Sequence, residues 1–299
     1  MRSRRAVAVG VFDGVHLGHR ALLRALRGEA QRRGLLATAL AFSNHPEEIL
    51  SGSPPPRLTT NEERRRLIEE EGLEVFEIPF TPELASMEAA EFSRRILKDL
   101  LGAELLVLGE GARMGRGQKA GPEELREALK PLGIEVVACP TVKADGKPIS
   151  SSRIRALLLE GEAEKAASLL GRPYELTGVV VRGEGRGRRE LVPTCNIRLP
   201  QEKLLPKEGV YAARAEVKGE EWPAVVNIGR RPTFGGGRTT VEAHLIGAPD
   251  LSLYGERMTL RLMRRLREER KFSSPAELRF QIKRDIEEAL RVLGPKRAV

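Results

Sequence analysis

Apolar runs alternate with amphipathic segments through the first half of this chain, and this alternation constrains the fold more than any other feature. The apolar runs have the length and composition of buried strands, and the segments between them have helical periodicity. The expected strands cover residues 6–11, 35–42, 73–78, 104–109 and 134–138. The expected helices cover residues 17–33, 61–71, 88–101 and 122–131. This spacing predicts βαβ units, and therefore a parallel, Rossmann-like α/β sheet with helices on both faces.

Two long loops interrupt the alternation, at residues 43–59 and 110–121. Loops of this length in a compact domain tend to be functional or mobile. Between them, Thr60 and Glu63 have the spacing of a capping box at the start of the second helix. Because ligands of parallel sheets bind beyond the carboxyl ends of the strands, we expect a functional site at this edge.

Beyond residue 171 the pattern changes to short β-rich runs separated by glycine turns. These runs cover residues 174–182, 192–198, 209–217, 222–228, 239–245 and 257–266. They predict a small antiparallel β-barrel. Two short helices, 150–159 and 162–170, are expected before the barrel. A final amphipathic helix is expected at 274–293, with Leu278, Ile282, Ile286 and Leu290 on its apolar face. We place the domain boundary at Gly171–Arg172, which gives domains of residues 1–171 and 172–299.

The composition limits the partners of this chain. Its 299 residues, 40% of them hydrophobic, suffice for two ordinary cores, and the net charge of +9 suits anionic partners such as nucleotides. Arginines interleave with glutamates, which favours a solvated, ion-paired surface, and 4% aromatic residues supply few stacking platforms for RNA. The sequence has no apolar run of membrane-spanning length. Cys139 and Cys195 form no C-x-x-C pair, and two cysteines without a signal peptide indicate a reducing cytoplasm.

Residues 9–19, V-G-V-F-D-G-V-H-L-G-H, join the first expected strand to the first helix through a glycine turn. This arrangement directs helix N–H groups at an anion. His16 and His19 lie three apart at the helix start and can face the same point. Backbone donors and two imidazoles suit a nucleotide phosphate whose charge grows during reaction. The spacing of histidines and cysteines supplies no obvious third ligand for a metal.

This string resembles the H-x-G-H signature of the nucleotidyltransferase superfamily, and F-D-G-V-H-L-G-H resembles the bacterial bifunctional riboflavin kinase/FAD synthetase family. A second string, I-S-S-S-R-I-R at 149–155, stands at a helix start, where hydroxyls are N-caps by default. It is similar to the I-S-S-T-x-I-R motif of adenylyltransferases, with Ser152 in place of the threonine. The resemblance implies adenylyl transfer from ATP to FMN, with release of pyrophosphate.

The resemblance also implies roles for individual residues of the first domain. His16 and His19 would stabilise the transition state at the α-phosphate. ATP-binding residues would be Gly10, Phe12, Gly14, Ser151, Ser152 and Arg155. Flavin-binding residues would be Phe42, His45 and Pro46, which are similar to an F-x-P-H-P element whose first proline is here Asn44.

The first domain departs from the family pattern in one loop. The family carries G-x-D-F-x-F-G after the fourth strand, whereas residues 109–115 read G-E-G-A-R-M-G and lack the aspartate and both phenylalanines. Val11 stands where the family usually has asparagine. These departures keep an alternative open, in which the chain retains the kinase and carries a degenerate adenylyltransferase domain.

The second half contains P-T-C-N at residues 193–196, which resembles the P-T-A-N motif of riboflavin kinases. Further similar segments follow in family order at 205–211, 226–234, 241–245, 253–255, 266–272 and 281–285. The resemblance implies that Thr194 and Asn196 hold Mg²⁺ and ATP, and that Glu242 is the base for the ribityl 5′-hydroxyl. Strand alternation supports Glu242 modestly, because it would point away from the face of Val241 and Ala243. Leu191 replaces a family glycine that would approach phosphate closely.

The sequence therefore predicts a cytoplasmic, bifunctional transferase that makes FMN from riboflavin and FAD from FMN. Its cofactor would be Mg²⁺, and its partners would be the small molecules ATP, riboflavin and FMN, with no nucleic acid or membrane. We expect a monomer or weak homo-oligomer. The kinase-only enzyme is one alternative, and a non-enzymatic, basic RNA-binding protein is the other.

Overall fold

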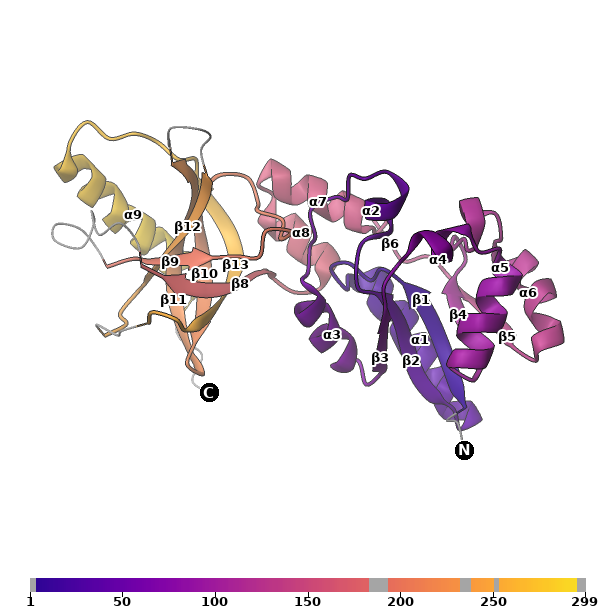
Figure 1. Ribbon diagram of the computed structural model, residues 1–299. Helices are drawn as coiled ribbons and strands as arrows, with labels where there is room; N and C mark the ends of the chain where they lie inside the picture. Colours follow the sequence, from indigo (N-terminus) through magenta and orange to yellow (C-terminus); the bar gives the residue numbers. More distant parts are fainter. Residues whose placement is uncertain (1–3, 183–192, 232–237, 250–252, 295–299) are drawn as a thin grey trace. The chain divides into compact units, whose positions relative to one another are not determined.

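The computed structural model describes residues 4–182, 193–231, 238–249 and 253–294. The glycine-rich segment 183–187, Leu191 and the P-T-F end of the 226–234 segment lie outside these residues. The chain divides into two compact units, Met1–Ser151 and Ser152–Val299, which are described separately (Figure 1). The domain boundary at Gly171–Arg172 stays a prediction.

A parallel sheet forms the centre of the first unit, as predicted. Its described strands follow the order β3-β2-β1-β4-β5. The bounds are β1 (Arg5–Gly10), β2 (Leu36–Phe42), β3 (Glu74–Ile78), β4 (Ala103–Gly109) and β5 (Glu135–Cys139). Each strand lies within one residue of its predicted bounds. All four neighbouring pairs are parallel, which places the carboxyl ends of the strands at one edge of the sheet.

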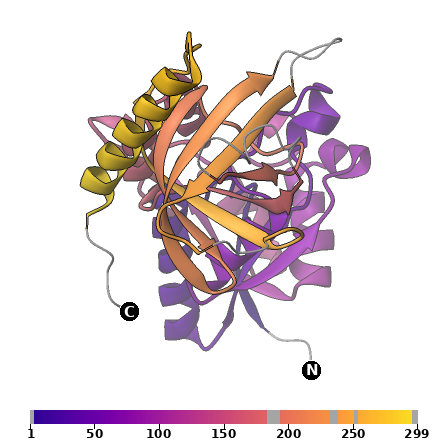
Figure 2. The same ribbon diagram turned by 90° about the vertical axis from the view of Figure 1, so that its left-hand side faces the viewer.

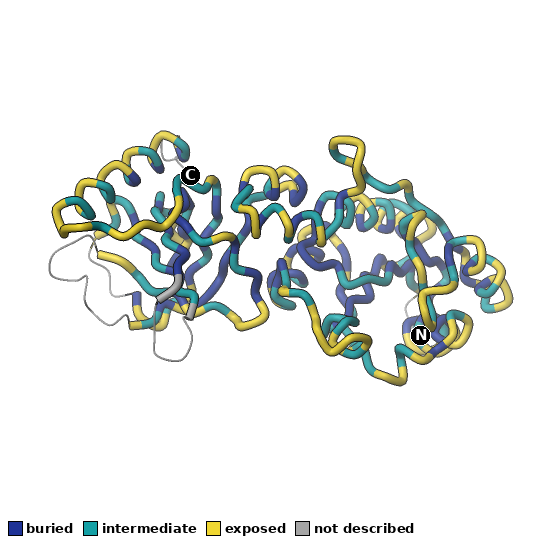
Figure 3. The backbone as a smooth tube through the Cα atoms, turned by 90° about the horizontal axis from the view of Figure 1, so that it is seen from above, coloured by how far each residue is buried: buried dark blue, intermediate teal, exposed yellow. Residues whose placement is uncertain are grey.

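Both faces of this sheet are buried, because successive residues of its strands enter different cores. Ala6 and Ala8 of β1 pack in one core with Leu23 of helix α1 (Leu17–Arg33). Val7 lies in the other core with Leu97 and Leu125. The two cores explain the continuous apolar runs of the sequence. In Figure 3 the buried colour runs along the strands, while the outer helical turns are exposed.

Two of the predicted helices change type before they end. The segment predicted at 88–101 is the α-helix α5 (Ala89–Phe92) followed by a π-helix, η1 (Ser93–Leu100). The segment predicted at 122–131 is α6 (Pro122–Leu129) followed by a 3₁₀ turn, η3 (Lys130–Leu132). The proline at 131 has no N–H to continue the α-helical ladder. Periodicity alone does not separate these helix types.

Several short elements were not predicted. They are α2 (Pro46–Leu50), α4 (Pro82–Ser86), η2 (Arg116–Gln118) and the hairpin of β6 (Lys143–Ala144) with β7 (Lys147–Pro148). All are too short for a periodic pattern. Capping chemistry could have found the two α-helices, because His45 and Thr81 cap them and a proline occupies the first turn of each.

The second unit begins with helices α7 (Ser151–Glu160) and α8 (Ala163–Leu170) and continues into a closed antiparallel barrel, as predicted. The described strands follow the order β10-β11-β12-β9-β8-β13 around it. Their bounds are β8 (Tyr174–Val181), β9 (Cys195–Arg198), β10 (Gly209–Val217), β11 (Glu220–Arg231), β12 (Arg238–Leu245) and β13 (Arg257–Arg267). Closure leaves the paired strands without an open edge.

Helix α9 (Pro275–Leu293) packs against β10, β11 and β13 of the barrel (Figure 2). Its predicted apolar face is wrong at Leu290, which is 42% exposed. The buried face instead carries Asp285, Ala289 and Leu293. Small Ala289 packs against Ala212 of β10, and the Asp285 carboxylate accepts hydrogen bonds from a barrel arginine. An ion pair and a small residue therefore define this contact.

The capping box predicted at Thr60 and Glu63 is present at the start of helix α3 (Asn61–Glu69). The Thr60 hydroxyl accepts the Glu63 N–H at 3.1 Å, and the Glu63 carboxylate accepts the Thr60 N–H at 2.9 Å. We expect Thr60→Ala to lower the free energy of unfolding of the first unit by about 1 kcal/mol, since it removes one cap bond. Thr60→Ser keeps the hydroxyl and should retain most of the stability.

Urea unfolding of the full chain, followed by circular dichroism, measures this difference. Trp222, the single tryptophan, lies on β11 in the barrel, so its fluorescence provides a control from the other unit. A Thr60→Ala transition identical to that of Thr60→Ser would contradict the assigned contribution of the cap.

Candidate active sites

The turn between β1 and α1 is built largely from residues in the left-handed region. Phe12, Gly14 and Val15 have positive φ angles of 51°, 81° and 38°. Phe12 is nearly fully buried, and an added Cβ at Gly10 would lie 3.1 Å from its ring. Close packing therefore favours glycine at position 10, and the left-handed backbone favours it at position 14.

His16 and His19 lie together at the start of α1. His16 is the N-cap, and its Nδ1 accepts the backbone N–H of His19 at 3.3 Å. The two rings stack with a centroid separation of 3.7 Å and an interplanar angle of 16°. The three-residue spacing thus gives the shared direction that the sequence predicts. Because Nδ1 accepts, a neutral His16 ring carries its proton on Nε2.

His19 is held in its neutral form. Burial, and secondarily the neighbouring His16, lower the pKa of His19 well below its usual 6.5. Its Nδ1 is fully buried and has no hydrogen-bond partner among the described residues. The edge of its ring meets the Phe12 ring, with centroids 5.4 Å apart. His19 can therefore donate a hydrogen bond to an anion without carrying a charge.

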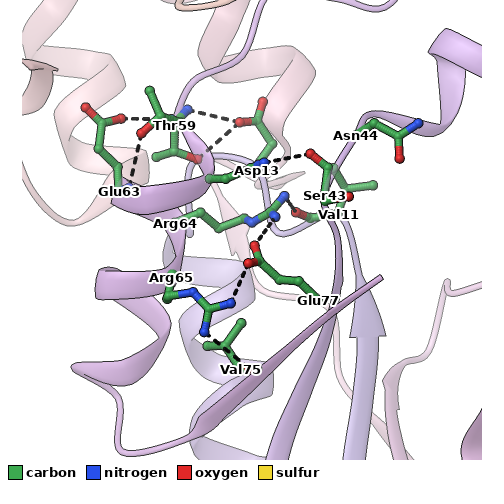
Figure 4. A network of polar contacts seen from close by, with 12 residues as sticks. Val11, Asp13, Ser43, Asn44, Thr59, Glu63, Arg64, Arg65, Val75 and Glu77 are labelled. Carbon is green, nitrogen blue, oxygen red and sulfur yellow. Dashed lines mark hydrogen bonds and ion pairs between the residues drawn. The ribbon is translucent and has the colours of Figure 1, made fainter. Parts of the chain in front are cut away.

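The carboxylate of Asp13 attaches the turn to the segment before α3 (Figure 4). Asp13 is buried, and its Oδ1 accepts the backbone N–H groups of Leu58 at 2.9 Å and Thr59 at 3.1 Å. In return, the hydroxyl of Thr59 accepts the backbone N–H of Gly14 at 3.0 Å. These bonds hold the end of the predicted long loop 43–59 against the turn. Sequence analysis missed this role, although a carboxylate inside an otherwise apolar string was its signal.

Arg64 of α3 supports the same turn from below (Figure 4). Its Nη1 donates to the Val11 carbonyl at 3.1 Å, and its Nη2 donates to Glu77 Oε1 at 2.8 Å. Burial lowers the pKa of Arg64, and the bond to Glu77 opposes that effect. Burial alone would raise the pKa of Glu77, but the hydrogen bonds from Arg64 and Arg65 lower it. The guanidinium thus remains a charged donor to the turn.

The second predicted string reaches the same turn through its second serine. The Ser151 hydroxyl donates to the Asp13 carbonyl at 2.8 Å. An added Cβ at Gly18 would lie 3.6 Å from the Ile149 carbonyl, so this segment also approaches the helix start. Ser152 and Arg155 follow on α7, in the second unit, and their part in ATP binding stays a prediction.

A pocket of about 460 Å³ lies beyond the carboxyl ends of β1 and β2 in the first unit. Gly10, Phe42 and Pro46 line it, together with Phe80 and Met114. Phe42 and Phe80 meet edge to face, with ring centroids 5.1 Å apart. The pocket therefore has an apolar, partly aromatic wall that suits a flat ring system.

One predicted flavin-binding residue is not part of the lining. The Nδ1 of His45 accepts the Glu47 N–H at 3.2 Å and caps α2, the helix that carries Pro46. Phe12 and Gly14 also form the turn rather than the pocket wall. His45 acts on the lining through Pro46, because it orders the short helix.

The loop that departs from the family pattern still forms one wall of this pocket. Arg113, Met114 and Gly115 line it. Gly115 has a φ angle of 75°, and an added Cβ there would lie 2.6 Å from the Ala89 backbone nitrogen. The loop is thus packed tightly on α5 without its usual aromatic residues.

The barrel brings the predicted kinase residues into one row. Glu242 of β12 lies in register with Asn227 of β11 on one side and Asn196 of β9 on the other. Val241 and Ala243 are buried, so Glu242 belongs to the opposite face of the strand, as alternation predicts. Thr194 is exposed and stands two residues before Asn196.

Hydroxyl, amide and carboxylate oxygens from Thr194, Asn196 and Glu242 are ligand types that suit a hard cation such as Mg²⁺. Next to them, the Asn227 side-chain amide donates to Glu269 at 3.0 Å. Sequence analysis assigned no role to Asn227 or Glu269. Only the pairing of β11 with β12 reveals that they adjoin the row.

Comparisons with known proteins cover both units. A family model described as FAD synthetase matches residues 1–153, and one described as riboflavin kinase matches residues 170–293. This chain belongs to the bifunctional riboflavin kinase/FAD synthetase family. The bifunctional riboflavin kinase/FMN adenylyltransferase of Pseudomonas fluorescens is 34% identical over 96% of this chain and 92% of the relative. That of Bacillus subtilis is 34% identical over 97% and 93%.

A solved structure is also similar over nearly the whole chain. It is described as a macrolide-efflux protein from Streptococcus pneumoniae, with 31% identity and a TM-score of 0.88 over 96% of this chain and 94% of the other. Within the part of the chain that the structure describes, no helix has the length and apolar character needed to cross a membrane.

The neutral state of His19 predicts a pH effect on stability. Since its folded-state pKa is lowered, the unfolded chain binds this proton more tightly. The stabilisation is complete above pH 6.5 and is lost as pH falls below that value. We expect His19→Gln to remove this part of the pH dependence in urea unfolding between about pH 5 and 7. Equal pH slopes for the variant and the wild type would contradict the buried, neutral assignment.

Proposed function

We propose that this chain phosphorylates riboflavin with ATP to give FMN, and then adenylylates FMN with a second ATP to give FAD and pyrophosphate. The match of both family models, one to each half of the chain, is the observation that carries this proposal. The kinase-only alternative finds no support, because the FAD synthetase model also matches. No comparison supports the RNA-binding alternative.

In the adenylyl transfer, an oxygen of the FMN phosphate forms a bond to the α-phosphorus of ATP, and the bond to pyrophosphate breaks. The reaction needs positioning and neutralisation of charge more than a covalent catalyst. We assign the α-phosphate to His16 and His19. His16 would donate from Nε2, because its Nδ1 already accepts a backbone N–H. Ser151, Ser152 and Arg155 would hold the β- and γ-phosphates.

The flavin ring of FMN would occupy the 460 Å³ pocket. Phe42 and Pro46 would contact the ring, and Gly10, Phe12 and Gly14 would shape the turn that receives the nucleotide. His45 would act by ordering α2. Support comes from the apolar lining and from the place of the pocket at the carboxyl edge of the sheet, where such folds bind nucleotides.

In the kinase reaction, Glu242 would accept the proton of the ribityl 5′-hydroxyl as that oxygen attacks the γ-phosphorus of ATP, and ADP would leave. Thr194 and Asn196 would hold Mg²⁺, which would neutralise phosphate charge. The shared row of Asn196 and Glu242 supports this assignment, since it brings oxygen ligands beside a carboxylate base.

The remaining proposals concern the whole chain. We propose functional domains of residues 1–171 and 172–299, a cytoplasmic location, and a monomer or weak homo-oligomer that acts on small molecules rather than nucleic acid.

His16→Ala should reduce FAD formation from FMN and Mg²⁺–ATP by about 10²- to 10³-fold, since it removes a donor to the reacting phosphate. The same variant should phosphorylate riboflavin at the wild-type rate. Chromatographic separation of the flavins measures both steps in one reaction. An unchanged FAD rate would refute the assigned role of His16.

Glu242→Gln should give the opposite result. Loss of the base should lower FMN formation by about 10²- to 10⁴-fold while riboflavin binding stays measurable. The variant should still convert added FMN to FAD, which shows that the chain is folded. Unchanged riboflavin turnover would refute Glu242 as the base.

A further inference from the structure

Asn44 makes a reciprocal pair of hydrogen bonds with the backbone of Phe80. Its Nδ2 donates to the Phe80 carbonyl at 3.0 Å, and its Oδ1 accepts the Phe80 N–H at 2.7 Å. A proline side chain, which the resemblance places at this position, could make neither bond. The asparagine therefore adds a specific pair of hydrogen bonds between the segments that follow β2 and β3.

These hydrogen bonds extend the pairing of the two strands beyond their ends. Phe42 pairs with Ile78 in the last register position of β2 and β3, and the Ser43 N–H then donates to the Ile78 carbonyl at 2.9 Å. The Asn44–Phe80 pair is the next link. It holds the Phe80 ring against Phe42 at an interplanar angle of 78°, and both rings line the pocket.

The 109–115 loop, which also lines the pocket, has no aromatic residue. Positions 112 and 114 are alanine and methionine where the family pattern has phenylalanine. Met114 lines the pocket, so the change alters the surface that a bound ring would meet. An aromatic contact that this loop cannot supply has to come from another part of the lining, which contains Phe42, Phe80 and Phe92. Of these, Phe80 is the one that Asn44 binds directly.

We propose that Phe80 supplies the aromatic contact to the flavin ring that the 109–115 loop lacks, and that Asn44 is the positioning residue that holds Phe80 in place. The inference rests on the proposed use of this pocket for FMN. Aromatic contacts contribute beyond the area they bury, so loss of the Phe80 ring weakens FMN binding more than loss of an equal apolar area elsewhere.

Phe80→Leu in the full chain tests the contact. We expect a rise in the KM for FMN of about three- to tenfold, with a smaller change in kcat, because the ring binds FMN in the ground state. The matched control is Phe76→Leu on β3, where the partly buried side chain packs against the core and does not line the pocket. An unchanged KM in Phe80→Leu, or an equal rise in Phe76→Leu, would overturn the proposal.

A rescue experiment tests whether Phe80 supplies the aromatic contact that the 109–115 loop lacks. Met114→Phe restores an aromatic side chain to the loop that lines the same pocket. In the Phe80→Leu background it should return the KM for FMN to within about twofold of the wild-type value. Failure of Met114→Phe to lower that KM would overturn the replacement.

Asn44→Ala tests the positioning role. The variant should raise the KM for FMN in the same direction as Phe80→Leu, and the double variant should be no worse than Phe80→Leu alone. Additive effects would overturn a role through Phe80. Riboflavin phosphorylation by the barrel is the internal control for enzyme concentration in every variant, and circular dichroism is the control for folding of the first unit.

The inference and the proposed function can fail separately. If the wild-type chain forms FMN but no FAD, the proposed function fails for this unit. FMN titration followed by flavin fluorescence, in wild type and Phe80→Leu with identical barrels, then decides the inference. Weaker FMN binding in the variant supports the contact, and equal binding overturns it.

Discussion

The buried Asp13 carboxylate holds the first site together. Its bonds to the Leu58 and Thr59 N–H groups, with the return bond from Gly14 to the Thr59 hydroxyl, attach the strained β1–α1 turn to the segment before α3. Hydrogen bonds to a buried charged group contribute about 1.5–3 kcal/mol each, which helps to maintain positive φ angles at non-glycine residues. The stacked histidines follow directly from this turn. A substitution of Asp13 would therefore disturb the turn and its histidines more than the strands of the sheet.

The two units place reactive groups by different means. In the parallel sheet, loops beyond the carboxyl ends of the strands bring the histidines and the apolar pocket to one edge. In the barrel, strand register alone aligns Asn196, Glu242 and Asn227 on the face opposite the core. The first arrangement depends on buried polar bonds that fix loops. The second depends on the register of three strands, which the buried side chains of the barrel determine.

The altered 109–115 loop illustrates how a family pattern can change without loss of the pocket. Its glycine at 115 packs on Ala89, so the loop keeps its place although the phenylalanines are absent. Met114 and Arg113 of this loop line the pocket together with Phe42, Phe80 and Phe92. Asn44, in place of proline, belongs to the same set of changes. A departure from a motif is therefore interpretable only with the residues that face it.

Local chemistry in the sequence determined the strand and helix order, the capping box at Thr60, the facing histidines and the outward direction of Glu242, because periodicity, capping and strand alternation act over a few residues. Tertiary structure decided what depends on distant partners. The clamp at Asp13, the support from Arg64 and the Asn44–Phe80 bonds join residues 36 to 53 positions apart. It also decided that α9 buries Asp285 rather than Leu290, because the partner of that carboxylate is Arg267 on β13. No local pattern encodes which distant group a buried charge will meet.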